Sequence, residues 1–158
     1  MDKENMTENN DEFNAMVLDY MEKGFLENII DMFKHDKSLF PLIGDLMTDE
    51  RMRVRLGIAS LVESLAKEDP ANLLCAISGI AALLRNENPI IRGDAAYLLG
   101  IIGHLDAIPF LKDALGDEHA DVRAIARESI QEINSKAASG EHERKDADDA
   151  QLKASESS

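Results

Sequence analysis

The sequence predicts an all-α fold, a right-handed α-solenoid of about three helical hairpins preceded by an N-terminal helical cap. The first observation is a repeat centred on Arg55, Arg92 and Arg123, each directly preceded by Val or Ile. Counted from that apolar residue, positions +4, +7, +8 and +11 are apolar in all three copies, except that the third has Ser129. This spacing places one apolar stripe along one face of a helix.

The second observation is a polar residue six positions before each arginine: Asp49, Asn86 and Asp117. These residue types favour turns and helix caps, and apolar pairs four residues apart precede each of them. Each unit is therefore predicted to be a helix, a polar turn and a second helix opened by the arginine. The third observation is the spacing of the arginines, 37 and then 31 residues, which is irregular but falls in the range of helical-hairpin repeats.

The middle copy is the most regular. It reads I-R-G-D-A-A-Y-L-L-G-I-I-G at Ile91–Gly103, followed by a helix over Ala107–Leu115 and by D-E-H-A-D-V-R at Asp117–Arg123. These residues resemble the HEAT repeat family and, within it, the type called PBS-lyase HEAT-like repeats. The resemblance covers roughly residues 38–136. It implies a stack of HEAT-like hairpins with a binding role, and it implies no particular partner.

The outer copies depart from the family pattern. In the first copy Gly57 replaces a larger residue, and Glu63 stands where the middle copy has Gly100. In the third copy Arg127 stands where the other two copies have alanine.

Composition narrows the function. Of the 158 residues 44% are hydrophobic but only 4% are aromatic, with no Trp, so the expected core is aliphatic. The net charge of −14 argues against a nucleic-acid partner, which requires a basic face, and against an anionic membrane surface. Solubility alone or a basic protein partner would each account for this charge. The single cysteine, Cys75, excludes an internal disulfide. With no signal sequence or membrane span evident, the expected location is cytoplasmic.

Taken in order, the chain begins with a polar, acidic segment, 1–11, predicted to be disordered, and ends with a charged tail, 137–158, predicted likewise. The HEAT-like helical repeat domain is predicted over 12–136. Its first two helices, on either side of Gly24, carry amphipathic stripes and are expected to cap the open end of the stack. Further helices are predicted at 38–47, from 49 or 50 to 67, and at 70–85, 89–103, 106–115 and 119–136.

The helix boundaries follow from local chemistry. Prolines near the first turns are tolerated because an N–H there has no helical partner, and glycine favours helix ends. The residues used are Ser38, Pro41, Asp69, Pro70, Asn88, Pro89, Gly103, Asp106 and Gly116.

Candidate chemical groups each have a structural alternative. The three arginines could bind an acidic ligand, or each could bond to turn carbonyls or to a neighbouring Asp and tie adjacent repeats together. One such position in every unit favours the second interpretation. The histidines are scattered and none pair at helical spacing, so no metal site, cofactor or enzyme activity is expected. Cys75 lies in an apolar helix with no basic residue nearby, which favours a packing role.

A partner-binding surface is predicted on the concave face. The helix 70–85 carries no charged residue between Leu73 and Leu84, and a helix that is apolar all round is buried or lines a contact surface. The predicted contact residues are Asp45, Ser78, Ala81, Ala82, Arg85, Lys112 and Asp113. All seven methionines lie at or before Met52, and they are either core filler or a second binding surface.

The predicted function is therefore that of a non-catalytic adaptor or scaffold that binds a protein partner. The alternative is an accessory subunit or lyase-like factor acting on a chromophore-bearing protein. The identity of the partner and the oligomeric state are left open by the sequence.

Overall fold

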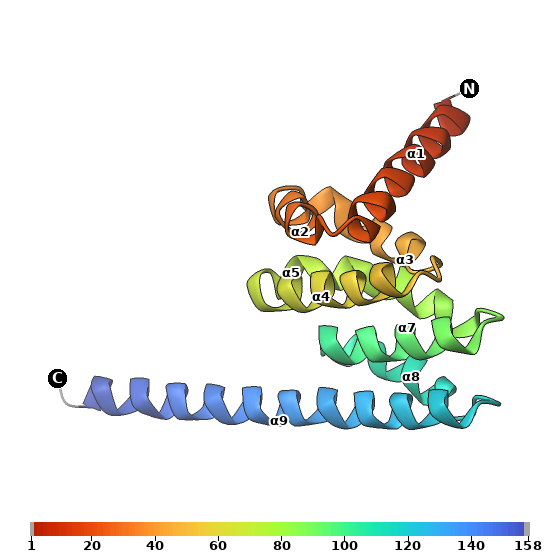
Figure 1. Ribbon diagram of the computed structural model, residues 1–158. Helices are drawn as coiled ribbons and strands as arrows, with labels where there is room; N and C mark the ends of the chain where they lie inside the picture. The colour runs from red at the N-terminus through yellow and green to blue at the C-terminus, as the bar shows by residue number, and fades with distance from the viewer. Residues whose placement is uncertain (1, 157–158) are drawn as a thin grey trace.

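The computed structural model describes the backbone of residues 2–156 and the side chains of residues 8–140. Within that part of the chain the regular elements are α-helices and 3₁₀ turns, without a strand. Figure 1 shows the helices stacked from α1 at the N-terminal end to α9 at the C-terminal end. The prediction of an all-α fold is confirmed.

The three helices opened by the arginines form one layer of the stack, which we call the arginine layer. Its members are α4 (Met52–Glu68), α7 (Pro89–Ile102) and α9 (Ala120–Glu156). Helix α7 lies between the other two and packs against both. The N-terminal pair, α1 (Asp2–Glu22) and α2 (Leu26–His35), packs against α4 and forms the first end of the stack.

The remaining elements form a second layer, the short-helix layer, in which α-helix alternates with 3₁₀ turns. They are η1 (Lys37–Leu42), α3 (Ile43–Leu46), α5 (Pro70–Leu73), η2 (Leu74–Ala76), α6 (Ile77–Ala82), η3 (Leu83–Arg85), η4 (Leu105–Ala107) and α8 (Ile108–Ala114). Helix α6 packs on α3 and also contacts η4.

This alternation corrects the prediction of single helices at 38–47, 70–85 and 106–115. Pro41 lies inside η1 and lacks the N–H that an α-helical turn would use. At the end of the 70–85 segment, Asn86 N donates to Leu83 O at 3.0 Å. Such i to i+3 bonds tighten the last turn of a helix, where the carbonyls lack later partners.

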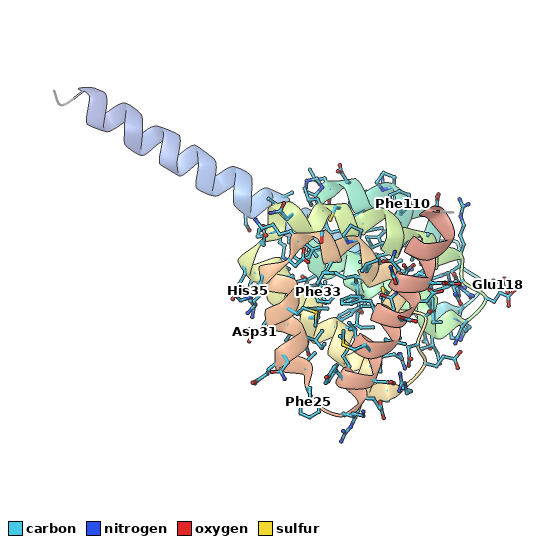
Figure 2. The ribbon with its side chains drawn as sticks, turned by 90° about the horizontal axis from the view of Figure 1, so that it is seen from above. Phe25, Asp31, Phe33, His35, Phe110 and Glu118 are labelled. Atoms are coloured by element: carbon cyan, nitrogen blue, oxygen red, sulfur yellow. The ribbon has the colours of Figure 1, made fainter. Side chains whose placement is uncertain are left out.

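One aliphatic core runs through the stack. Phe33 and Phe40 are its largest fully buried residues, and Figure 2 shows Phe33 in the interior while Phe25 lies at the edge. The stripe predicted for the arginine-led helices is buried throughout except for Ile130, which is half-buried. Of the five methionines whose side chains are described, four pack in or against this core and Met52 is exposed. Those four methionines are therefore core filler.

The ends of the chain differ from the prediction. Helix α1 begins at Asp2 and α9 continues to Glu156, so helical backbone occupies most of 1–11 and 137–158. Neither segment contains proline, and Ala is the most frequent residue of the second; alanine has the highest helix propensity. The parts of the prediction that concern residues 1, 157 and 158 lie outside the described residues. The domain limits at 12 and 136 stay a prediction.

The outward side of α9 explains the departure of the third copy. Ala96 in α7 is fully buried, whereas Arg127 at the matching position of α9 is exposed. Gln131 and Asn134, which follow at helical spacing, are also exposed. Helix α9 thus presents a polar surface where α7 presents an alanine to its neighbour, as a terminal repeat must.

Leu99 tests the core. Its side chain is fully buried in the middle of α7, so Leu99→Ala leaves a cavity and is expected to lower the free energy of unfolding by about 2–5 kcal/mol. Urea titration followed by circular dichroism measures this loss. A loss below about 1 kcal/mol, the range of a surface substitution, would contradict the burial of Leu99.

Truncation tests the tail. Residues 137–158 contain one large apolar side chain, Leu152, and no atom beyond the local helix lies within 4 Å of a Cβ built on Gly140. Deletion of 137–158 is therefore expected to leave the thermal midpoint nearly unchanged. A large fall in the midpoint would show that the tail packs on the stack.

Candidate partner-binding surface

Helix α6 divides into an inner and an outer side. Ile77, Ile80 and Ala81 are buried, while Ser78 and Ala82, four residues apart, are exposed on the other side. Arg85, at the end of η3, continues the exposed side. The structure therefore places Ser78, Ala82 and Arg85 on the surface, as predicted.

Ala81 corrects the predicted surface. Its residue is only 6% exposed and belongs to the core cluster. The physical reason is helical spacing, because Ala81 follows Ile77 by four residues and shares its inward direction. The helix has no charged residue between Leu73 and Leu84 to mark the boundary between its two sides, so the sequence pattern did not separate Ala81 from Ala82.

The neighbouring helices supply the other predicted residues. Asp45 on α3 and Lys112 and Asp113 on α8 are all exposed. Helix α3 contacts α6 through backbone, since a Cβ added to Gly44 would lie 2.9 Å from the carbonyl carbon and oxygen of Gly79. The predicted residues therefore lie on four members of the short-helix layer, α3, α6, η3 and α8.

A hollow of about 230 Å³ lies between α6 with η3 on one side and α8 on the other. We call it the α6–α8 hollow. It is lined by Ala81, Leu84, Arg85, Phe110, Asp113, Ala114 and Asp117. The structure thus brings three predicted residues together here: Arg85 and Asp113 with exposed side chains, and Ala81 at the floor. Asp45, Ser78, Ala82 and Lys112 do not line the hollow.

Sequence reasoning missed Phe110 and Leu84. Phe110 is 41% exposed, and Figure 2 shows it at the periphery of the stack. A signal was present, because Ala107, Leu111 and Ala114 make the inward stripe of this segment and an aromatic residue next to that stripe is off its face. A large aromatic side chain left on the surface is typical of contact sites.

Cys75 is exposed and lies near this surface on η2. Partial burial raises the pKa of its thiol above the ordinary value. Because the thiolate is the reactive form, this environment disfavours nucleophilic chemistry at neutral pH.

The turns before the arginines fix where each helix of the arginine layer begins. Asp49, Asn86 and Asp117 each accept a hydrogen bond from the backbone N–H two residues later, at 2.9, 2.8 and 2.9 Å respectively. These three equivalent turns confirm the predicted role of the polar residues.

Arg55 and Arg92 each bridge to a following repeat. Arg55 donates to both carboxylate oxygens of Asp94 at 2.7 and 3.0 Å. Arg92 donates to both oxygens of Asp117 at 2.8 and 3.1 Å and also to the carbonyls of Asn86 and Glu87. Arginine presents two parallel donors that match a carboxylate, so both contacts are bidentate.

Among the described residues Arg123 bonds only within its own turn, to the carbonyls of Asp117 and Glu118 at 2.7 and 3.1 Å. The structural interpretation is therefore confirmed for Arg55 and Arg92, whereas Arg123 bonds to turn carbonyls without a contact to another repeat among the described residues. Arg92 pairs with the turn residue of the following repeat, Asp117. The equivalent turn residue for Arg55 is Asn86, which has no carboxylate, and Arg55 pairs instead with Asp94.

Charge state follows from this pairing. The hydrogen bonds from Arg92 hold the pKa of Asp117 below its ordinary value, and those from Arg51 do the same for the pKa of Asp49. The side chains of Arg92 and Asp117 are 13% and 9% exposed, so this pair is less exposed to solvent than the Arg51–Asp49 pair. It anchors α7 to the turn that precedes α9.

A metal-binding cluster and a membrane-spanning helix are both absent from the described residues. No group of three His, Cys, Asp or Glu side chains lies where it could hold a metal ion. None of the helices there combines the length and apolar character needed to cross a membrane.

Comparison with known protein families supports the class of repeat. Residues 75–131 match the family model described as HEAT repeats. This range contains α6, α7, α8 and the first part of α9, together with Arg92 and Arg123. The resemblance to the HEAT repeat family is thus supported over this part of the chain. No curated protein sequence matches the chain.

The Arg92–Asp117 pair predicts an acid-dependent stability. Asp117 has a lowered pKa in the folded state, so its stabilising contribution is complete above the unfolded pKa of about 4 and is lost as pH falls through the lower folded value. Arg92→Met leaves a shielded carboxylate unpaired and is expected to destabilise the protein most at neutral pH. The difference in thermal midpoint between wild type and variant should shrink as pH falls below about 4.

Asp117→Asn is the matched control, because Asn86 shows that asparagine can make the same turn. The double variant completes a thermodynamic cycle for the pair. If the difference in thermal midpoint between wild type and Arg92→Met stays constant from neutral to acidic pH, Asp117 does not cause the pH dependence.

Proposed function

We propose that the protein is a non-catalytic interaction module, an adaptor or scaffold that binds a protein partner on its short-helix layer. The observation that carries the proposal is the α6–α8 hollow, where the exposed ring of Phe110 stands beside an exposed cation, Arg85, and an exposed anion, Asp113. An apolar anchor surrounded by a few polar groups is the usual composition of a protein contact site.

The surface next to the hollow supports close approach of a partner. Ser78 and Ala82 are small and exposed, and Gly79 between them is also exposed. A partner backbone can therefore reach α6 without displacing long side chains. Arg85 and Asp113 give opposite charges at the rim, which favours one orientation of the partner.

From the residues of the middle copy, Ile91–Gly103, we infer that the stack is a right-handed solenoid of the PBS-lyase HEAT-like type. We also infer that the protein is cytoplasmic. The second candidate, an accessory or lyase-like factor for a chromophore-bearing protein, predicts a change in chromophore absorbance on addition of the protein. An adaptor predicts none.

Ala82→Glu tests the proposed surface. Ala82 is exposed, so the variant is expected to fold, while a carboxylate placed in the contact must be desolvated on binding at a cost of several kcal/mol. The expected result is loss of a partner captured by the wild-type protein from the native cell extract, with circular dichroism unchanged. Quantitative pull-down followed by calorimetry with the purified partner measures it.

Ala15→Glu on α1 is the control, because it introduces the same side chain at another exposed helical position. Phe110→Ala should weaken the same interaction by removing the apolar anchor. A folded Ala82→Glu variant that binds the partner with wild-type affinity would place the contact elsewhere.

A further inference from the structure

The arginine layer carries a second groove, which lies between α7 and α9. One hollow of about 180 Å³ is lined by Pro89, Ile90, Gly93, Ile125 and neighbouring residues. Another of about 250 Å³ is lined by Tyr97, Gly100, Ile101, Ile125 and neighbouring residues. Ile125 lines both hollows, so they adjoin at this residue, and together we call them the α7–α9 groove.

The floor of the groove is low because two glycines of α7 face α9. A Cβ added to Gly100 would lie 2.6 Å from Ser129 Oγ, and one added to Gly93 would lie 3.3 Å from Ile125 Cδ1. The helices therefore approach closely at these points, and the ridges beside them stand above the floor. Ile90 and Tyr97, 52% and 48% exposed, form the ridge on α7.

The walls of the groove are acidic. Asp121 lines the first hollow, and Glu128 and Glu132 line the second. Glu128 and Glu132 are exposed and stand four residues apart on one helix face, a spacing at which like charges repel. Among the described side chains neither forms an ion pair with Lys or Arg within 4.0 Å.

Tyr97 reports the same environment. Its hydroxyl donates to Glu63 Oε1 at 3.4 Å. Partial burial, then the charges of Glu63 and Glu132, raise the pKa of Tyr97 above the ordinary value. Carboxylates from α4 and α9 thus both act on the ring that forms the ridge.

The cations near the groove leave this negative character in place. Arg55 is engaged with both oxygens of Asp94. Lys136 does not line either hollow, and its Nζ donates to Ile101 O at 3.4 Å. His119 lines the first hollow, and its Nδ1 accepts from the backbone N–H of Asp121. A cation supplied from outside is therefore complementary to Glu128 and Glu132.

We propose that the α7–α9 groove binds a basic amphipathic helix of a partner protein. Apolar side chains of that helix enter the two hollows on either side of Ile125, and its Lys or Arg residues face Glu128 and Glu132. This is the helix-in-groove mode of recognition, with charge setting the choice of partner. The surface lies in the arginine layer and does not depend on the contact proposed for the short-helix layer.

The test uses a fluorescein-labelled helical peptide built only of leucine and lysine, with a peptide of leucine and glutamate as its counterpart. Fluorescence anisotropy with the full-length protein is expected to show binding of the lysine peptide only, weakening as salt is added. Glu128→Lys/Glu132→Lys should reduce its affinity by about tenfold or more. Shifts of the Ile101 and Ile125 methyl signals in NMR spectra are expected on binding.

The matched control is Glu8→Lys/Glu12→Lys, which makes the same charge change at the same helical spacing on an exposed part of α1. If this control loses as much affinity as the groove variant, the attraction is a general effect of net charge and the proposal fails. Absence of binding by the wild-type protein, or methyl shifts confined to other isoleucines, would also overturn it.

Two more variants keep the outcomes distinct. Should the double lysine variant fail to fold by circular dichroism, Glu128→Gln/Glu132→Gln removes the charges without repulsion and is expected to show the same direction of change. Ala82→Glu should leave the peptide affinity unchanged, so that failure of the short-helix contact and failure of the groove are separate results.

Discussion

The close approach of α7 and α9 is the constraint on which the arrangement of the arginine layer depends. At Gly100 any Cβ would overlap Ser129, and Ser129 Oγ donates to Ala96 O at 2.8 Å in the buried interface. A hydroxyl inside a core is acceptable only when it has a partner, and the carbonyl of Ala96 provides one. The short-helix layer has a similar contact where Gly44 meets Gly79. Small residues at both places set the distance between repeats, and the aliphatic core fills the remaining space.

Bidentate arginine contacts lie near the N-terminal ends of α4 and α7, whereas Gly100 lies near the C-terminal end of α7. They link Arg55 to Asp94 and Arg92 to Asp117 across successive repeats, while Gly100 lets the C-terminal part of α7 approach α9. Partly buried pairs of this kind are costly to break from one side, because the remaining charge loses its partner. The orientation of each repeat on the next is thus specified at two points along the same helix. Arg123 lacks such a partner among the described residues, consistent with the polar outer side of α9.

Repetition explains how much the sequence could predict. Three copies of the arginine, the turn residue and the apolar stripe each indicate the same local structure, so the stripe positions and the role of Asp117 followed without coordinates. Features that depend on two helices at once did not follow. The pairing of Arg55 with Asp94 requires knowledge of which turn of α7 faces α4, and the α7–α9 groove requires the depth of the contact at Gly100. Ala81 was misplaced because its helix has no charged residue to define a side.

The distribution of charge separates the two surfaces. On the short-helix layer Arg85 and Asp113 carry opposite signs beside Phe110, a mixture that selects orientation more than charge. On the arginine layer Glu128 and Glu132 stand beside an apolar floor, and Glu63 adds a third carboxylate near Tyr97. Part of the net charge of −14 is therefore concentrated where apolar side chains are also exposed. Carboxylates dispersed over a surface are explained by solubility alone. Carboxylates that repel one another along a groove are instead stabilised when a cation binds between them. The clustered carboxylates of the α7–α9 groove therefore favour a basic ligand for that surface.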